Sequence, residues 1–294
     1  MKKILGIVSS ARRLGNCEIM VKEVFRGLDE PCELHLLRLT DFRIDPCQGC
    51  YHCLFKDGHC VIEDDHATVL EAIASADAVI LAAPAYFLGA HSALKRFLDR
   101  GLCLYGSVDR LWGKPAVGVA VAGIPGMEGS TLLGIQNFLK LILADIRQTQ
   151  VVYGALPGEI FLDDGNRSIA RSLAQRLFDP TVSRVDPCCS LCGGDTFRFL
   201  GRDRVRCMLC SNSGSIYMHS DGTTGVRMEA ADHQLFLTRQ DVINHRNWLI
   251  GMKQRFIDLR KDLKPITIDY LKDGHWIKPC SMGHSTDCNK DDQA

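Results

Sequence analysis

The chain has 294 residues, which suits one large domain or two ordinary ones. Hydrophobic residues make up 46% and charged residues 24%, so the composition allows a sizeable core and excludes a disordered chain. Lys plus Arg (35) equals Asp plus Glu (35), which argues against nucleic-acid binding. The most apolar stretch, 76–90, is interrupted by Pro84, and the apolar run after Met1-Lys2-Lys3 is too short for a secretory signal. We therefore expect a cytoplasmic protein with no membrane or nucleic-acid partner.

The first 155 residues alternate between strand and helix patterns. Apolar strands are predicted at 4–8, 33–39, 78–83, 116–122 and 150–153. Helices are predicted at 17–28, from Asp64 or Asp65 (as a cap) to 74, at 91–104 and at 132–144, and a closing helix at 163–178. Strands that are apolar on both faces and separated by helices imply a parallel sheet covered on both sides. The sequence therefore predicts a doubly wound α/β domain.

The composition changes after residue 180. Residues 186–230 are rich in Cys, Gly, Ser and Arg, which indicates short strands and turns, and 238–263 has the apolar periodicity of a long helix that stops before Pro265. The polar end holds Cys280, His284 and Cys288 but is expected to be a flexible tail. We expect a domain at 1–180, a small module at 186–220, an extension with the long helix at 221–270, and the tail at 280–294.

The fourteen cysteines are clustered, four between residues 47 and 60 and five between 188 and 210. Disulfides are rare in the cytosol, so clusters of this kind indicate metal ligation. Cys32 and Cys103 are expected to be ordinary buried thiols, and Cys188 is expected to be a spare neighbour of a ligand.

Three loops follow apolar strands of the predicted sheet. The first, 9–17, is rich in hydroxyls and opens a helix, so it either binds an anion at the helix N-terminus or is an ordinary turn. It matches neither GxGxxG nor a P-loop. The second, 84–89, carries an aromatic pair, and the third spans 123–131. Since the carboxyl ends of parallel strands meet at one edge, the three loops are expected to form one crevice.

Together these loops resemble the flavodoxin-like NAD(P)H-dependent FMN reductases, and more narrowly the iron–sulfur flavoproteins. The resemblance covers residues 1–155 and rests on Ser10-Ala11-Arg12…Gly15-Asn16, Pro84-Ala85-Tyr86-Phe87…Lys95…Asp99-Arg100 and Gly126-Met127-Glu128-Gly129-Ser130-Thr131. It implies a flavodoxin-like fold of five parallel strands with one FMN per subunit. The implied FMN contacts are Ser10, Arg12, Asn16 and Cys17 at the phosphate, and Pro84, Ala85, Tyr86, Phe87, Gly123, Gly126 and Glu128 beside the isoalloxazine. Ser9 and Cys17 depart from the family, which usually has Gly and a hydroxyl residue there.

The spacing Cys47-x2-Cys50-x2-Cys53-x6-Cys60 matches the compact motif of iron–sulfur flavoproteins. That resemblance implies that the four thiolates hold a [4Fe–4S] cluster near the flavin. Zinc binding, or simple packing of the loop, are the alternatives, because related loops do not all bind a cluster.

The second group has the spacing C-x2-C-x14-C-x2-C, formed by Cys189, Cys192, Cys207 and Cys210. Two such pairs, separated by a spacer that fits a short hairpin, predict a zinc-ribbon-like module, with a rubredoxin-like mononuclear iron site as the alternative. A region with so little apolar content needs a bound metal to fold.

The leading interpretation is an FMN-dependent oxidoreductase with a [4Fe–4S] cluster, which passes electrons from a reduced nicotinamide or ferredoxin-like donor to an unidentified acceptor. One alternative is an NAD(P)H-dependent flavin or quinone reductase without a cluster. Another is a redox-responsive flavin sensor that acts through the ribbon. The resemblance implies a homo-oligomer, either a homodimer or a homotetramer.

Overall fold

The computed structural model describes residues 1–179, 181 and 187–277. It forms two compact units, Met1–Ile250 and Gly251–Ala294. The expected flexible tail at 280–294, with its two cysteines and His284, lies outside the described residues.

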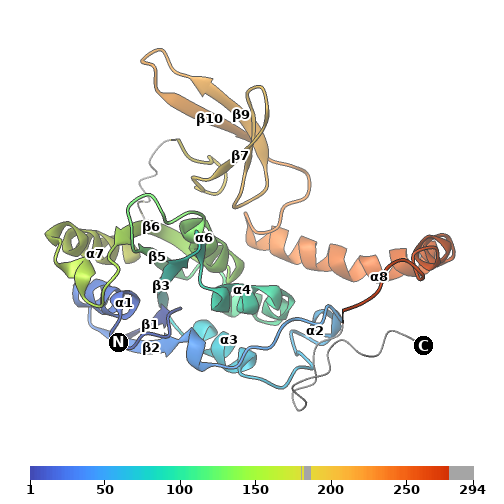
Figure 1. Ribbon diagram of the computed structural model, residues 1–294, viewed down its shortest axis with the longest axis horizontal. Helices are drawn as coiled ribbons and strands as arrows, with labels where there is room; N and C mark the ends of the chain where they lie inside the picture. Colours follow the sequence, from blue (N-terminus) through green and yellow to red (C-terminus); the bar gives the residue numbers. More distant parts are fainter. Residues whose placement is uncertain (180, 182–186, 278–294) are drawn as a thin grey trace. The chain divides into compact units, whose positions relative to one another are not determined.

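A parallel sheet forms the centre of the first unit (Figure 1). Its strands, in the order β2-β1-β3-β5-β6, are β2 (Cys32–Arg38), β1 (Lys2–Val8), β3 (Ala78–Tyr86), β5 (Pro115–Ala122) and β6 (Asp145–Tyr153). The two-residue β4 (Gly89–Ala90) pairs antiparallel with the end of β3. The order reverses between β1 and β3, which confirms the predicted flavodoxin-like, doubly wound sheet.

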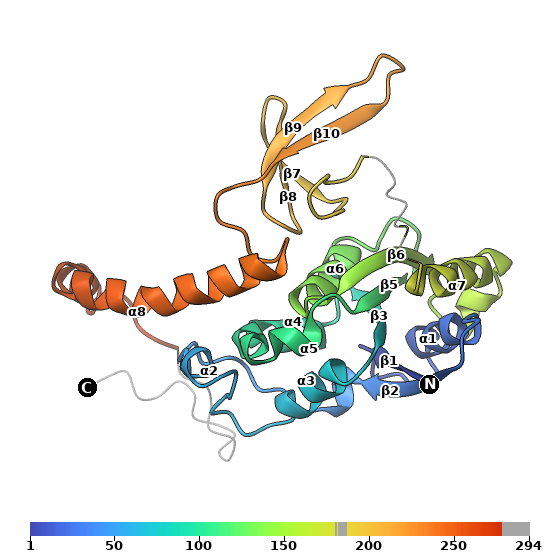
Figure 2. The same cartoon turned by 180° about the vertical axis from the view of Figure 1, so that it is seen from behind.

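Helices cover both faces of this sheet (Figure 2). One apolar core lies under α1 (Asn16–Arg26) and α7 (Asp164–Leu177). The other lies under α3 (His66–Ala74), α4 (Ser92–Asp99) and α6 (Thr131–Leu141), and includes the fully buried Phe97 and Phe138. Short turns and helices complete the domain: η1 (Leu39–Asp41), α2 (His52–Phe55), η2 (Gly101–Ser107), α5 (Val108–Leu111) and η3 (Glu159–Phe161).

The helix expected at 91–104 ends at Asp99 and gives way to the 3₁₀ turn η2. Gly101 and Gly106 lie in this turn, and glycine is a poor helix former because it loses much backbone entropy on ordering. The shortening places Arg100, at the junction, in the interior of the protein.

A second, antiparallel sheet follows, in the order β10-β9-β8-β7. Its strands are β7 (Phe197–Gly201), β8 (Arg204–Cys207), β9 (Ser213–Met218) and β10 (Thr224–Glu229). A small core that includes Cys189, Val205 and Leu209 lies beneath it. The sheet continues past residue 220, the end expected for this module, because β10 pairs with β9 along its length. The domain boundaries at 180 and 221 otherwise stay predictions.

The last helix, α8, spans Arg239–Ile268. Thr238 begins it with a reciprocal cap, in which Thr238 Oγ1 accepts from the Asp241 backbone while the Asp241 carboxylate accepts from the Thr238 N–H. The helix was expected to stop before Pro265 but includes it. Pro265 lies in the final turn, where the loss of one backbone hydrogen bond disturbs few residues. Among the described helices, none is long and apolar enough to span a bilayer.

Candidate functional site

The loop 9–15 joins β1 to α1 at the carboxyl edge of the sheet. Gly15 is the N-cap of α1 and offers no side chain, and no described side chain caps the first turn, so its N–H groups are available to an anion. A Cβ at Gly15 would lie 2.9 Å from the Arg12 Cβ, which explains the glycine. The buried Ser9 hydroxyl also lacks a hydrogen-bond partner among the described residues. These groups fit a phosphate.

Arg38 and Glu18 hold this loop from behind. Arg38 Nη1 donates to the backbone oxygens of Ser10 (2.8 Å) and Arg12 (2.9 Å), and Nη2 donates to Glu18 Oε2 (2.6 Å). The same carboxylate accepts from the Leu14 N–H at 2.8 Å. Burial acts to raise the pKa of Glu18, but hydrogen bonds from Lys22 and Arg38 outweigh it and lower the pKa to about 2. Glu18 is therefore ionised, and the loop conformation is fixed before any ligand binds.

A cavity of about 210 Å³ opens beside the loop. Eight of the predicted FMN residues line it: Ser10, Arg12, Asn16, Cys17, Pro84, Ala85, Tyr86 and Gly123. Sequence reasoning missed five more: Gly15, Val121, Gly154, Ala155 and Pro157. The walls come from the ends of four strands, β1, β3, β5 and β6, as expected for a ligand crevice in an open α/β sheet.

The loop after β6 is the wall that the sequence did not reveal. Asn16 Nδ2 donates to the Gly154 oxygen and Asn16 Oδ1 accepts from the Gly158 N–H, both at 2.8 Å. Arg12 Nη1 donates to the Ala155 oxygen at 3.2 Å. Arg12 and Asn16, which were expected to bind the phosphate, therefore also hold the loop after β6 in place.

Cys17 lies in the first turn of α1 and is 3% exposed. Burial raises the pKa of its thiol to about 12, so the sulfur carries no charge that would repel a phosphate.

The remaining three predicted FMN residues, Phe87, Gly126 and Glu128, lie on the loops beside the cavity rather than in its wall. The Phe87 side chain is fully exposed. The loops after β3 and β5 are joined, because Ser130 donates from its N–H to the Leu88 oxygen at 2.7 Å. Glu128 accepts from the Tyr153 hydroxyl at 3.0 Å.

Comparison with known proteins gives the family. Residues 2–154 match the family model "NADPH-dependent FMN reductase". The chain belongs to the NADPH-dependent FMN reductase family. It is 31% identical over 187 residues to an iron–sulfur flavoprotein of Methanocaldococcus jannaschii, a match that covers 60% of this chain and 95% of the relative. It also resembles the solved structure of a flavone reductase, with a TM-score of 0.71, 18% identity, and coverage of 94% of this chain and 99% of that chain.

Members of this family are FMN-dependent oxidoreductases, and so is this chain. The cavity fits the cofactor because the uncapped N-terminus of α1 forms part of its wall and, among the described residues, Arg12 is the one charged residue in a lining that is otherwise uncharged.

The cysteine loop 47–60 lies between η1 and α3 and is tightly wound. Left-handed backbone conformations occur at Gly49, Tyr51, Asp57 and Gly58. All four cysteines are free thiols, with Cys47 and Cys50 exposed and Cys53 and Cys60 partly buried. Burial raises the pKa of Cys53, and the nearby thiols of the other three cysteines raise it further. The Cys53 thiol thus lies within electrostatic range of the other three cysteines of the loop.

The loop packs directly against η2. A Cβ at Gly58 would lie 2.4 Å from the Cys103 oxygen, and one at Gly106 would lie 2.1 Å from the Asp57 oxygen. No side chain larger than hydrogen fits at either position without movement of the backbone. Of the two thiols expected to be buried, Cys103 is buried here, whereas Cys32, near the edge of the sheet on β2, is only partly buried.

The second cysteine group forms a compact site. The sulfurs of Cys189, Cys192, Cys207 and Cys210 lie within 4.8 Å of one another, as the spacing predicts. Cys189 and Cys210 sulfurs are 3.7 Å apart, and those of Cys192 and Cys207 are 3.5 Å apart. Four thiols at this separation suit one tetrahedral ion. Hydrogen bonds among them lower the pKa of Cys210 and raise that of Cys192.

Asn212 supports this site from outside. Its Nδ2 donates to the Cys210 sulfur at 3.3 Å and to Gln234 Oε1 at 2.8 Å. Its Oδ1 accepts from Gln234 Nε2 (2.8 Å) and from the Ala231 N–H (2.9 Å). The buried Asn212 therefore ties the cysteine site to the segment that leads into α8.

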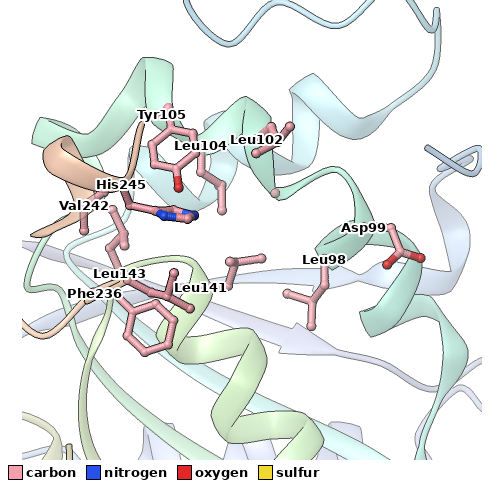
Figure 3. Close-up of a pocket in the computed structure, with 12 residues that line it drawn as sticks. Leu98, Asp99, Leu102, Leu104, Tyr105, Leu141, Leu143, Phe236, Val242 and His245 are labelled. Atoms are coloured by element: carbon pink, nitrogen blue, oxygen red, sulfur yellow. The ribbon is translucent and has the colours of Figure 1, made fainter. Parts of the chain in front are cut away.

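That segment also borders a second cavity, of about 230 Å³ (Figure 3). The cavity has an apolar lining contributed by α4, η2, the end of α6 and residues 235–245. Tyr105 and His245 point toward one another at one end, and Asp99 lies apart from them. Burial raises the pKa of Tyr105 to about 12 and lowers that of His245 below its usual value, so both groups are neutral at pH 7. This cavity shares no lining residue with the one beside loop 9–15.

Proposed function

We propose that this FMN-dependent oxidoreductase carries a [4Fe–4S] cluster on Cys47, Cys50, Cys53 and Cys60, and couples a reduced nicotinamide or ferredoxin-like donor to a separate acceptor. The observation that carries the proposal is the loop itself, which holds four free thiols and turns tightly through four residues with left-handed backbone conformations. The similarity to an iron–sulfur flavoprotein supports it.

The donor set suits a cluster rather than a single ion. Mononuclear sites hold four sulfurs close together, as the ribbon cysteines do. A four-iron cluster attaches each thiolate to a different iron, so its ligands lie farther apart. Within residues 1–179, 181 and 187–277, the 47–60 cysteines form no group at mononuclear spacing.

When bound, FMN supplies hydride acceptance and release of one or two electrons, and a cluster supplies single-electron transfer. The chain supplies binding and orientation. The first turn of α1 and Arg12 bind the phosphate, and the Glu18–Arg38 pair keeps loop 9–15 in its binding shape. Tyr86 and the glycines of the β5 loop border the ring system. The ribbon cysteines hold a structural zinc, with iron as the alternative.

A flavin or quinone reductase without a cluster is the second candidate. The exposure of Cys47 and Cys50 favours it, because buried cluster ligands are protected from solvent and oxidation. The metal content separates the two candidates.

The deciding experiment measures iron, acid-labile sulfide, zinc and FMN per chain in anaerobically purified protein. We expect about four irons, four sulfides, one zinc and one FMN. The variant Cys50→Ser should lose iron and sulfide but keep FMN, and Cys32→Ser, on β2, is the matched control that should keep all four. FMN and zinc without sulfide would contradict the cluster and leave the second candidate.

The donor is then identified by anaerobic oxidation of NADH and NADPH with a panel of acceptors. The panel includes free flavin, a benzoquinone, a flavone and a ferredoxin, since a flavone reductase shares the fold over 94% of this chain. Turnover with none of the nicotinamide or ferredoxin donors would contradict the proposed donor class.

A further inference from the structure

Arg100 is a charged residue in the interior of the first unit. It follows α4 directly and is 2% exposed. A buried guanidinium is costly unless its charge is balanced and its N–H groups are bonded. Its partners therefore indicate what the protein uses it for.

Asp64 balances the charge. The Arg100 Nη1 group pairs with Asp64 Oδ2, and the Asp64 side chain is itself fully buried. Asp64 also accepts from the Asp45 N–H at 2.7 Å and the His66 N–H at 3.1 Å. These two residues stand just before and just after the cysteine loop, so the carboxylate closes the base of the loop and fixes Arg100 against it.

The other side of Arg100 faces the cysteine motif. Burial acts to lower the pKa of Arg100, but the Asp64 carboxylate and the Cys60 thiol beside the guanidinium outweigh it and raise that pKa. Its Nε–H is buried and has no hydrogen-bond partner in the described part of the chain. The Asp64 carboxylate accepts from Nη1 and from two backbone N–H groups, but not from Nε. An unbonded guanidinium donor beside a cluster ligand indicates that an acceptor belongs there.

We propose that Arg100 is a positioning residue that donates hydrogen bonds to the sulfur atoms at the Cys60 corner of the cluster and thereby raises its reduction potential. The inference rests on the proposed function, because it requires the cluster. Reduction adds negative charge to the cluster, and hydrogen bonds to its sulfurs stabilise the reduced form more than the oxidised form. Asp64 cancels the net charge of Arg100, so the N–H bonds, rather than a bare charge, carry the effect.

Redox titration of the cluster, followed by its electron paramagnetic resonance signal, tests this role. Arg100→Gln is expected to shift the midpoint potential to a more negative value, and Arg100→Lys to shift it less, because lysine keeps a charge and a donor but not the planar fork. Arg43→Gln is the matched control: Arg43 lies at the base of the same loop but is exposed and paired with Asp45. The control should keep the wild-type potential. An unchanged potential in Arg100→Gln with full iron content would overturn the inference.

A second measurement uses the wild-type protein, in case the Arg100 variants do not assemble. Protein grown with ¹⁵N-arginine is reduced, and its pulsed resonance spectrum is searched for a coupling between ¹⁵N and the cluster spin. We expect a coupling that persists in labelled Arg43→Gln, and its absence in the wild type would overturn the inference. Wild-type protein without iron and sulfide would instead sink the proposed cluster and this role together, so the two failures are distinguishable.

Discussion

His66, a single buried residue, makes the stability of this protein depend on pH. It is 2% exposed and its ring stacks on Phe97, with centroids 4.7 Å apart. Burial, and secondarily the charge of Arg100, lower the pKa of His66 to about 4. The folded protein therefore keeps the imidazole neutral at pH values where the unfolded chain, with its ordinary pKa of 6.5, binds a proton.

The stability that depends on an uncharged His66 is fully present above pH 6.5 and is lost as the pH falls toward 4. The shift corresponds to about 3 kcal/mol of unfolding free energy, at about 1.4 kcal/mol for each pKa unit. We predict that His66→Phe narrows the difference between urea unfolding free energies measured at pH 7 and pH 4.5. His35→Gln, at a half-exposed histidine on β2, should leave that difference unchanged. Equal pH dependence in wild type and His66→Phe would contradict the prediction.

The Glu18–Arg38 pair gives a second prediction at the residue scale. Arg38 fixes the shape of loop 9–15 by donating to the backbone oxygens of Ser10 and Arg12, without lining the cavity itself. We therefore expect Arg38→Met to weaken FMN binding about 10-fold or more. A tenfold loss corresponds to about 1.4 kcal/mol. FMN titration of the flavin-free protein, followed by flavin fluorescence, measures it. Arg26→Gln, on the exposed face of α1, is the control, and equal affinities in the two variants would refute the role of the pair.

The predicted FMN residues that the structure brings together are close to one another in sequence or follow neighbouring strands. Eight of the predicted FMN residues lie at or just after the carboxyl ends of strands, and all eight line one cavity. Arg38, Asp64 and Arg100 could not be found in this way, because their roles come from partners distant in the chain: Arg38 reaches back to Ser10, and Arg100 to Asp64. Nothing in the pattern around a single buried arginine identifies the loop that it supports.

At the scale of elements, the ribbon is an antiparallel sheet whose small core is built around its cysteines. Asn212 is the outer support of Cys210 and also binds Gln234. We predict that Asn212→Ala lowers the affinity of the ribbon for zinc by 10- to 100-fold, the usual effect of losing an outer partner of a ligand. Competition with a coloured chelator measures the affinity. Asn247→Ala, at an exposed position of α8, should match the wild type, and an unchanged affinity in Asn212→Ala would show that the bond to Cys210 is dispensable.

The elements themselves were largely predictable, because strand and helix periodicities in the first 155 residues are strong. The helix expected at 91–104 was wrong in its second half, since two glycines favour the 3₁₀ turn η2. Pro265 was expected to end α8 and does not. Strand β10 lies beyond residue 220, the end expected for the module, because its pairing with β9 is set by contacts between strands and not by the cysteine spacing.

At the scale of the whole molecule, the ribbon and the flavin domain have separate cores. The ribbon core is small and contains three of the four cysteines proposed to hold zinc, so on that proposal metal binding forms part of the folding free energy of the ribbon. We predict that a zinc chelator abolishes the ribbon transition in calorimetry while the FMN absorbance and the transition of the flavin domain persist. Simultaneous loss of FMN would show that the two regions unfold as one. The expected homodimer or homotetramer stays a prediction, which light scattering can check.

The backbone contact between Gly58 and Gly106 has a consequence for how this protein can change over evolutionary time. A residue inserted between Cys53 and Cys60 would push the loop into η2, and a methyl group at either glycine would collide with a carbonyl oxygen. Substitutions and insertions are therefore restricted in two separate stretches of the sequence at once, the cysteine loop and η2. A descendant that lengthens the loop must also redesign η2, so we expect the two glycines and the six-residue gap to be inherited, or lost, together.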